Sequence, residues 1–112
     1  MTSFTSGRRA EQKASEHLAG LRYSVIEQNW RTRWCEIDLV ATKGDTVYFV
    51  EVKYRSTSDY GVGLDYITQQ KLRQMNFAAE FWIASHQWRG KVELAAIEVA
   101  GPDYEVRDLL IL

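Results

Sequence analysis

Hydrophobic and polar positions alternate most clearly around the middle of this 112-residue chain. Two runs rich in β-branched and aromatic residues, 34–41 and 46–53, flank the pair Gly44-Asp45. Alternation with a period of two is typical of a strand that is buried on one face. A Gly-Asp pair between two such runs indicates a tight turn. The pattern therefore predicts a β-hairpin.

The rest of the chain predicts two helices and three more strands. They are a helix over 7–19, a strand over 22–30, a second helix that begins at Gln69, and strands over 92–99 and 105–111. Ser6 and Thr68 have the residue type of helix N-caps, and Gly20 is predicted to stop the first helix. This order, αβββαββ, predicts an α/β fold in which helices flank a mixed central sheet.

The turn fixes which residues of the hairpin face one another. With Gly44 and Asp45 as the loop, Lys43 pairs with Thr46, and continuing the register puts Asp38 opposite Glu51. Directly opposed residues have Cβ atoms about 4.5–5.5 Å apart, so two like charges there repel each other. The pair Asp38 and Glu51 therefore predicts a divalent cation between the two carboxylates.

The same register puts Glu36 opposite Lys53, which predicts a salt bridge. It also predicts that four charged residues share one face and four apolar residues share the other. The charged set is Glu36, Asp38, Glu51 and Lys53, and the apolar set is Ile37, Leu39, Val50 and Val52. The alternative is an exposed hairpin face whose charges only offset one another, an arrangement that contributes little to stability.

The chemistry of this face favours Mg²⁺ or Mn²⁺. Hard divalent ions take oxygen ligands, usually one or two carboxylates together with water and substrate phosphates. Such an ion activates water and polarises a phosphoryl oxygen, and Lys53 could offset the charge that develops. Glu11, at the border of the apolar stripe of the first helix, could complete the acidic cluster or remain a solvated helix residue.

Length and composition fit one domain with a hydrophobic core, because 46% of the residues are hydrophobic. We expect that domain to span 7–112, after a flexible N-terminus over 1–6. Cys35 is the only cysteine, which excludes an internal disulfide, and the sequence contains no signal peptide or long apolar stretch. These features predict a cytoplasmic protein without a membrane segment.

Charge is unevenly distributed around a net value of −1. Residues 1–35 carry six Lys or Arg and three Glu, a balance of +3, so the remainder sums to −4. Lys71 would lie in the first turn of the second helix, where the helix dipole disfavours a cation, so a contact with a phosphate would explain it. Arg9, Arg33 and Arg55 could follow a phosphate backbone. The alternative is that these three arginines and Lys71 are ordinary surface cations.

The four tryptophans and six tyrosines allow two interpretations. Aromatic side chains stack on unpaired bases in proteins that bind single strands. Packing in the core or at its edge is the better interpretation for most of them, because Trp82 lies on the apolar stripe of the second helix.

Two strings in the hairpin resemble a known family. Residues 36–40 (EIDLV) and 48–55 (YFVEVKYR), with Ala10-Glu11 upstream and Lys71 downstream, resemble the YraN family of bacterial proteins. Asp38 followed by Glu51-Val52-Lys53 is similar to the PD-(D/E)XK nuclease signature. Cys35 stands where that family usually has glycine, and Ile37 stands in place of the signature's proline.

The resemblance implies a restriction-endonuclease-like fold, similar to archaeal Holliday-junction resolvases. It implies metal-site roles for Glu11, Asp38 and Glu51, and a catalytic role for Lys53. The function it implies is metal-dependent hydrolysis of phosphodiester bonds in DNA, with branched DNA as the substrate class and a homodimer as a plausible assembly. The alternative is a non-catalytic nucleic-acid-binding or protein-interaction module that retains the nuclease fold.

Overall fold

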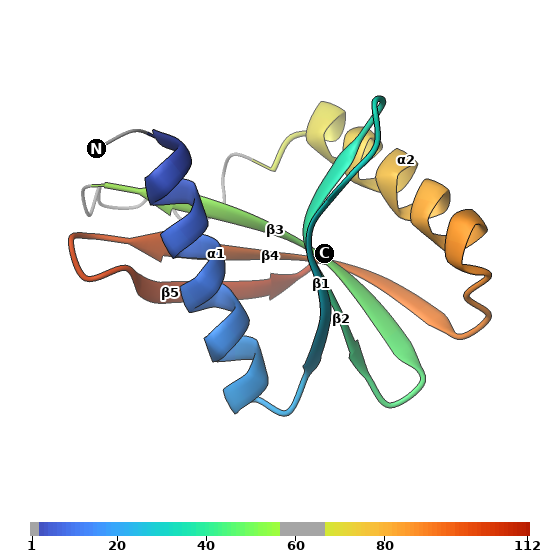
Figure 1. Cartoon of the computed structure of the whole chain (residues 1–112), viewed down its shortest axis with the longest axis horizontal. Helices are drawn as coiled ribbons and strands as arrows, with labels where there is room; N and C mark the ends of the chain where they lie inside the picture. Colours follow the sequence, from blue (N-terminus) through green and yellow to red (C-terminus); the bar gives the residue numbers. More distant parts are fainter. Residues whose placement is uncertain (1–2, 57–66) are drawn as a thin grey trace.

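The computed structural model describes the backbone of residues 3–56 and 67–112, and side chains from Gly7 onward within those ranges (Figure 1). The elements are α1 (Ser3–Gly20), β1 (Ser24–Arg31), β2 (Glu36–Lys43), β3 (Thr46–Arg55), α2 (Gln69–His86), β4 (Lys91–Ala100) and β5 (Glu105–Ile111). The predicted order αβββαββ is confirmed. Neither described helix is long and apolar enough to cross a membrane.

The five strands form one mixed sheet in the order β1-β2-β3-β4-β5. β3 and β4 are parallel, whereas the other neighbouring strands are antiparallel. Parallel neighbours need a crossover connection, and α2 lies in that connection. The predicted mixed sheet flanked by helices is therefore confirmed, and it is consistent with a compact nuclease-like fold.

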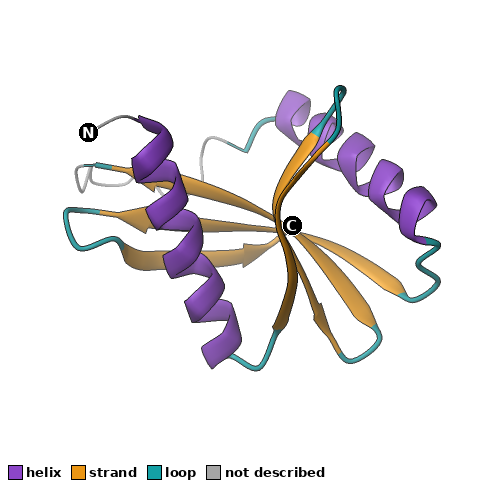
Figure 2. Ribbon diagram, in the orientation of Figure 1, coloured by secondary structure: helices purple, strands orange, loops and turns teal. Residues whose placement is uncertain are grey.

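The two helices cover opposite faces of the sheet (Figure 2). Alternation along β3 separates two cores, because Val50 packs on the α1 side and Phe49 on the α2 side. The α1 core contains Ala10, Ala14, Leu18, Leu39, Ala41, Val50, Ala95, Ile97, Val99 and Tyr104. The α2 core contains Ile37, Val40, Val47, Phe49, Ala78, Ala79 and Trp82.

The ends of the helices were predicted with mixed success. Thr68 is the N-cap of α2, and its hydroxyl accepts a hydrogen bond from the Lys71 backbone N–H. By contrast, α1 begins at Ser3, so Ser6 is not its N-cap, and Gly20 is still helical. The left-handed residue after α1 is Arg22, with φ 73°. The Tyr23 N–H donates back to the Leu18 carbonyl, as in a Schellman end.

The predicted hairpin register is confirmed for the five pairs nearest the turn, from Lys43 with Thr46 to Leu39 with Val50. Gly44 has φ +63°, the conformation that a type II′ turn requires at its first loop residue. The ladder ends at Leu39 and Val50. The pairs predicted beyond this point, Asp38 with Glu51 and Glu36 with Lys53, are therefore wrong.

The ladder ends because β2 changes face near Asp38. Ile37 packs in the α2 core, whereas Leu39, two residues later, packs in the α1 core. Regular alternation would put both on the same face, so the prediction that Ile37 shares the face of Leu39 is wrong. The neighbouring strand β1 is irregular too. Its register shifts between Val25 and Glu27, and Asn29 has φ 53°.

Glu36 precedes this change of face in β2 and has a different partner from the one predicted. Its carboxylate forms an ion pair with Arg31 of β1, with 3.2 Å between Nη2 and Oε2. The predicted partner, Lys53, lies on β3 beside Glu98 of β4. Both members of the Arg31–Glu36 pair are largely exposed, so this ion pair contributes little to stability.

Candidate functional site

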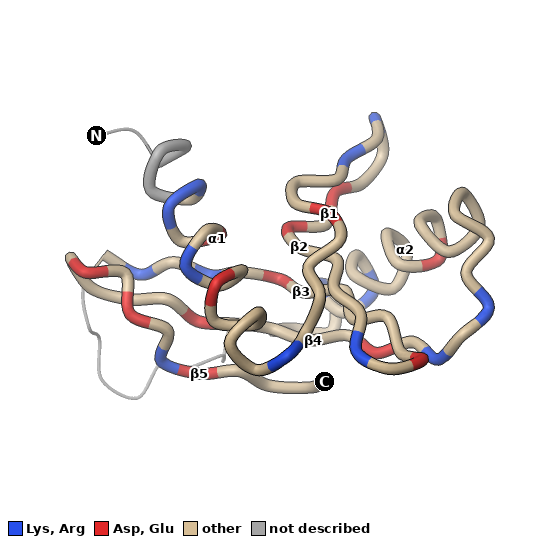
Figure 3. Tube along the Cα trace, turned by 60° about the horizontal axis from the view of Figure 1, so that its bottom comes forward, with Lys and Arg blue, Asp and Glu red and all other residues tan. Residues whose placement is uncertain are grey.

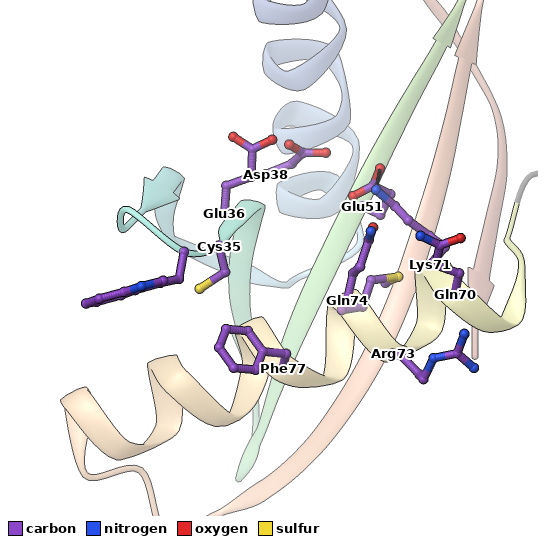
Figure 4. Close-up of a pocket in the computed structure, with 11 residues that line it drawn as sticks. Cys35, Glu36, Asp38, Glu51, Gln70, Lys71, Arg73, Gln74 and Phe77 are labelled. Atoms are coloured by element: carbon purple, nitrogen blue, oxygen red, sulfur yellow. Dashed lines mark ion pairs between the residues drawn. The ribbon is translucent and has the colours of Figure 1, made fainter.

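A cleft of about 480 Å³ opens between β2, the middle of β3 and the first half of α2 (Figure 4). Its residues are Trp34, Cys35, Glu36, Asp38, Glu51, Gln70, Lys71, Arg73, Gln74, Met75 and Phe77. The carboxylates of Glu36 and Asp38 lie together at one end, and Lys71 reaches Glu51 across the cleft. The predicted metal ligands Asp38 and Glu51 therefore share this cleft although they do not pair in the ladder.

Asp38 is held by the backbone where β2 leaves β3. The Val52 N–H donates a hydrogen bond of 2.8 Å to Asp38 Oδ2, so the carboxylate takes the place of a ladder acceptor. Burial first, and then the charges of Glu51, Glu11 and Glu36, raise the pKa of Asp38 to about 7, against the Val52 hydrogen bond, which lowers it. A carboxyl group with this pKa is half protonated near neutrality.

Glu51 lies on the α2 side of β3 and forms an ion pair with Lys71, with 2.9 Å between Nζ and Oε2. The pair is partly buried, because the two side chains are 31% and 22% exposed. An anion contact was predicted for Lys71 because of its place in the first turn of α2. Within the described residues, that anion is the Glu51 carboxylate.

Glu11 approaches the same acids from α1, on the other side of the sheet. Its Oε1 is buried and has no hydrogen-bond partner among the residues that the structure describes, which is costly for a carboxylate. Burial raises the pKa of Glu11, and a hydrogen bond from the Asn29 side chain opposes the rise. Asn29, whose side chain makes this hydrogen bond, has a left-handed backbone.

The acids fit a small oxygen-ligand site in part. Figure 3 shows acidic positions of β1 and β2 between α1 and α2. No group of three or more His, Cys, Asp or Glu residues within 3–56 and 67–112 is gathered closely enough to hold an ion. Mg²⁺ needs only one or two protein carboxylates, however. The donor set of Asp38 and Glu51, with the buried Glu11 oxygen behind it, therefore suits Mg²⁺ or Mn²⁺.

Lys53 lies on the same side of β3 as Glu51, two residues further along the strand. Of the residues that the structure describes, the cleft lining includes Glu51 but not Lys53. Lys53 is half-buried, and its backbone is opposite Glu98, which is 3% exposed. Its predicted catalytic role stays a prediction.

The four cations predicted to bind nucleic acid do not form one surface. Lys71 lines the cleft, and Arg33 is beside it, 5.3 Å from the ring centroid of Trp34. Arg55 forms an ion pair of 2.6 Å with the buried Glu98. Arg9 lies over Tyr104, 5.1 Å from its ring centroid, in a separate region lined by α1 and the β4–β5 turn.

Several cleft residues were not among the site residues predicted from the sequence. Gln70, Gln74 and Phe77 have the spacing of one helical face beside the buried stripe of α2, and this signal was available. Arg73 and Trp34 complete the set of such residues. Trp34 follows no period, because it belongs to the turn between β1 and β2.

Comparison with known proteins assigns the chain to a family. The pattern described as "Uncharacterised protein family UPF0102" matches residues 10–100, which include Glu11, Asp38 and Glu51. The chain belongs to this family. A UPF0102 protein of Clavibacter michiganensis is 40% identical over 97 residues, covering 86% of this chain and 82% of the relative. One from Cytophaga hutchinsonii is 34% identical, covering 95% and 94%.

A third UPF0102 protein, from Geobacter sulfurreducens, is 39% identical over 100 residues and covers 87% of this chain and 78% of the relative. These matches confirm the family resemblance drawn from residues 36–40 and 48–55. The description of the UPF0102 family names no activity. An activity for this UPF0102 chain must therefore be argued from the cleft itself.

Proposed function

We propose that this UPF0102 protein is a metal-dependent endonuclease that hydrolyses phosphodiester bonds in DNA, with branched DNA as the substrate class. One observation carries the proposal: Asp38 and Glu51 line one cleft, and the charge of Glu51 raises the pKa of Asp38. Acids whose charges oppose one another in a cleft are a marker of functional sites. A divalent cation between them would relieve that repulsion.

Each residue of the proposed site has a separate role in hydrolysis. Asp38 and Glu51 would hold Mg²⁺ or Mn²⁺, which would polarise a phosphoryl oxygen and make a water molecule more acidic. The Val52 N–H keeps the Asp38 carboxylate oriented. Lys71, 2.9 Å from Glu51, can turn from that carboxylate to a substrate phosphate. Lys53 is proposed to offset charge developing on the phosphate.

The ion pair between Lys71 and Glu51 also supports a second candidate. Lys71 already neutralises one of the two proposed ligands, so the cleft could bind nucleic acid or a protein without an ion and without turnover. This would be a non-catalytic module that retains the nuclease fold. The two candidates differ in whether DNA is cut.

Cleavage of linear, flapped and four-way DNA in Mg²⁺ and in Mn²⁺ tests the proposal. The wild-type protein should cut at least one of these substrates, and EDTA should abolish the reaction. Asp38→Asn should reduce the rate by at least about 100-fold, because the ion site and its transition-state stabilisation are lost. Lys53→Ala should also reduce it.

Asp45→Asn is the matched control, because Asp45 belongs to the same hairpin but its side chain is 72% exposed. It should cut at the wild-type rate. Cleavage that survives both Asp38→Asn and Lys53→Ala would contradict the proposed site and indicate a contaminant. Binding of DNA without cleavage in either metal would favour the non-catalytic module.

A further inference from the structure

Two large aromatic side chains of the cleft are unusually exposed. Trp34 is 65% exposed and Phe77 is 51% exposed, although both line the cleft that contains Asp38 and Glu51. Leaving such rings in water forfeits the favourable free energy of burying them. Exposed apolar surface beside polar groups is typical of binding sites. A ligand with a flat apolar face would explain both exposures.

The turn that carries Trp34 is well ordered by its own hydrogen bonds. The Thr32 hydroxyl accepts from the backbone N–H groups of Trp34 at 3.1 Å and Cys35 at 3.2 Å. The Thr32 N–H donates to the Cys35 carbonyl at 2.8 Å. These bonds fix the backbone on both sides of Trp34, so the ring is presented from a rigid turn and loses little freedom when a ligand stacks on it.

Phe81 supports both rings from α2. Its centroid is 5.8 Å from that of Trp34 and 6.3 Å from that of Phe77. Trp34 and Phe81 are inclined by 32°, and Trp34 stays 65% exposed beside Phe81. The two exposed rings and Phe81 are called the aromatic platform below. It joins the β1–β2 turn to α2, and Figure 4 shows its member Phe77 on α2.

Cations lie next to the aromatic platform. The Arg33 guanidinium is 5.3 Å from the Trp34 centroid, and Lys71 and Arg73 line the same cleft from α2. Flat rings for stacking and cations for phosphates are the two components of single-strand binding sites. A purely apolar partner would gain nothing from these three cations, whereas the phosphates of a nucleic acid would.

We propose that the aromatic platform stacks on an unpaired base and so brings a nucleotide in a single strand, flap or junction to Asp38 and Glu51. The assignment of the neighbouring phosphate to those acids rests on the proposed function. Stacking itself does not, because it requires neither an ion nor turnover. The substrate class is thereby narrowed to DNA with at least one unstacked nucleotide, and intact duplex is a poor ligand.

Anisotropy titrations of the full chain in EDTA test stacking apart from cleavage. The probes are a labelled 12-nucleotide thymidine oligomer and a 12-base-pair duplex. The wild-type protein should bind the single strand more tightly than the duplex. Trp34→Ala and Phe77→Ala should each weaken single-strand binding by about tenfold, in line with the loss of one stacking contact, and should change duplex binding little.

Three controls make the readout specific. Trp34→Phe should retain most of the affinity, because it keeps a ring. Leu110→Ala removes a side chain of similar exposure, 46%, from the edge strand β5 and should leave binding unchanged. Asp45→Asn removes an exposed acid outside the cleft and should bind the single strand as well as wild type does, which separates stacking from a general change of charge.

Equal effects of Trp34→Ala on single strand and duplex, or no effect on either, would overturn the stacking proposal and leave the proposed cleavage standing. Failure of the wild type to bind the single strand would overturn it as well. A change in oligomeric state on Trp34→Ala, with oligonucleotide binding unchanged, would indicate that a second copy of the chain covers the rings. Single-strand binding without any cleavage would uphold stacking and reject the nuclease.

Discussion

At the scale of single residues, Asp38 concentrates the electrostatic cost of the site. Its pKa is raised from 3.8 to about 7 by burial first and then by Glu51, with smaller contributions from Glu11 and Glu36. One hydrogen bond, from the Val52 N–H, stabilises the charged form. An acid in this setting binds a proton or a cation more readily than an ordinary aspartate does. The proposed function therefore depends most on Asp38.

The shifted pKa predicts how stability depends on pH. Between about pH 4 and pH 7, folded Asp38 holds a proton that the unfolded chain has released. The free energy of unfolding should therefore fall as the pH rises from ~4 to ~8, by at most about 4 kcal/mol. Asp38→Asn removes the charge and should remove this fall. Urea unfolding of both proteins at several pH values, without divalent ions, measures the difference.

Two further variants control this comparison. Glu51→Gln should reduce the fall in part, because the charge of Glu51 is the second cause of the raised pKa. Asp45→Asn changes an exposed acid of the same hairpin and should leave the fall intact. The same pH dependence in wild type and Asp38→Asn would show that Asp38 is not the titrating group.

At the scale of elements, β2 assembles the site by leaving the ladder. It pairs regularly with β3 up to Leu39 and Val50 and then changes face, so that Ile37 joins the α2 core. The Asp38 side chain reaches across to the Val52 N–H at the point of separation. A regular hairpin would have buried or exposed its acids by alternation alone. The change of face instead leaves Asp38 in a cleft that α2 also lines.

Part of this arrangement follows from sequence rules. The Gly-Asp loop fixes the register near the turn, because Gly44 can adopt a positive φ, and Thr68 is recognisable as an N-cap. The change of face in β2 does not follow, since alternation predicts Ile37 and Leu39 on one face whereas they pack in different cores. The end of α1 was also misplaced, because Arg22 adopts the conformation expected of glycine.

The candidate site, like the fold, could be predicted from the sequence only in part. Asp38 and Glu51 were predicted to meet because both strands start from one known turn. Their ligand cleft needs α2, whose approach to β2 depends on tertiary packing of Phe49 and Trp82, with ring centroids 5.3 Å apart. The aromatic platform needs the same approach, together with a turn that follows no period. No local pattern predicts such contacts.

The turn between β2 and β3 is tied to the connection between α2 and β4. The Asp45 carbonyl accepts a hydrogen bond of 2.8 Å from the Lys91 N–H, and a Cβ at Gly90 would collide with the same carbonyl oxygen. Gly90→Ala should therefore lower the free energy of unfolding by about 2 kcal/mol, the usual cost of overpacking. Chemical denaturation measures the loss.

Gly20→Ala is the matched control, because a Cβ there would meet no atom within 4 Å. That change, at the end of α1, should be neutral or stabilising. An equal loss in both variants would mean that the contact between Gly90 and Asp45 does not position the hairpin.

At the scale of the whole molecule, the acids converge from both layers of the fold. Glu11 comes from α1 and Glu51 from the α2 side of the sheet, and both act on Asp38 in the strand between them. Figure 3 shows some of the acidic positions between α1 and α2, and others toward the ends of the molecule. The chain has a net charge of only −1. The negative charge around Asp38 is therefore a local feature, and repulsion between charges over the whole molecule is small. A divalent cation in the cleft would offset the negative charge that Glu11, Asp38 and Glu51 bring together.

Calorimetric titration of Mn²⁺ into the wild-type protein and Asp38→Asn, at about pH 8, tests this claim most directly. The pH lies above the pKa of Asp38, so the carboxylate is ready to bind the ion. We predict one ion per wild-type chain, loss of that binding in Asp38→Asn, and wild-type behaviour of Asp45→Asn. Equal binding by wild type and Asp38→Asn, or no binding by either, would contradict the account.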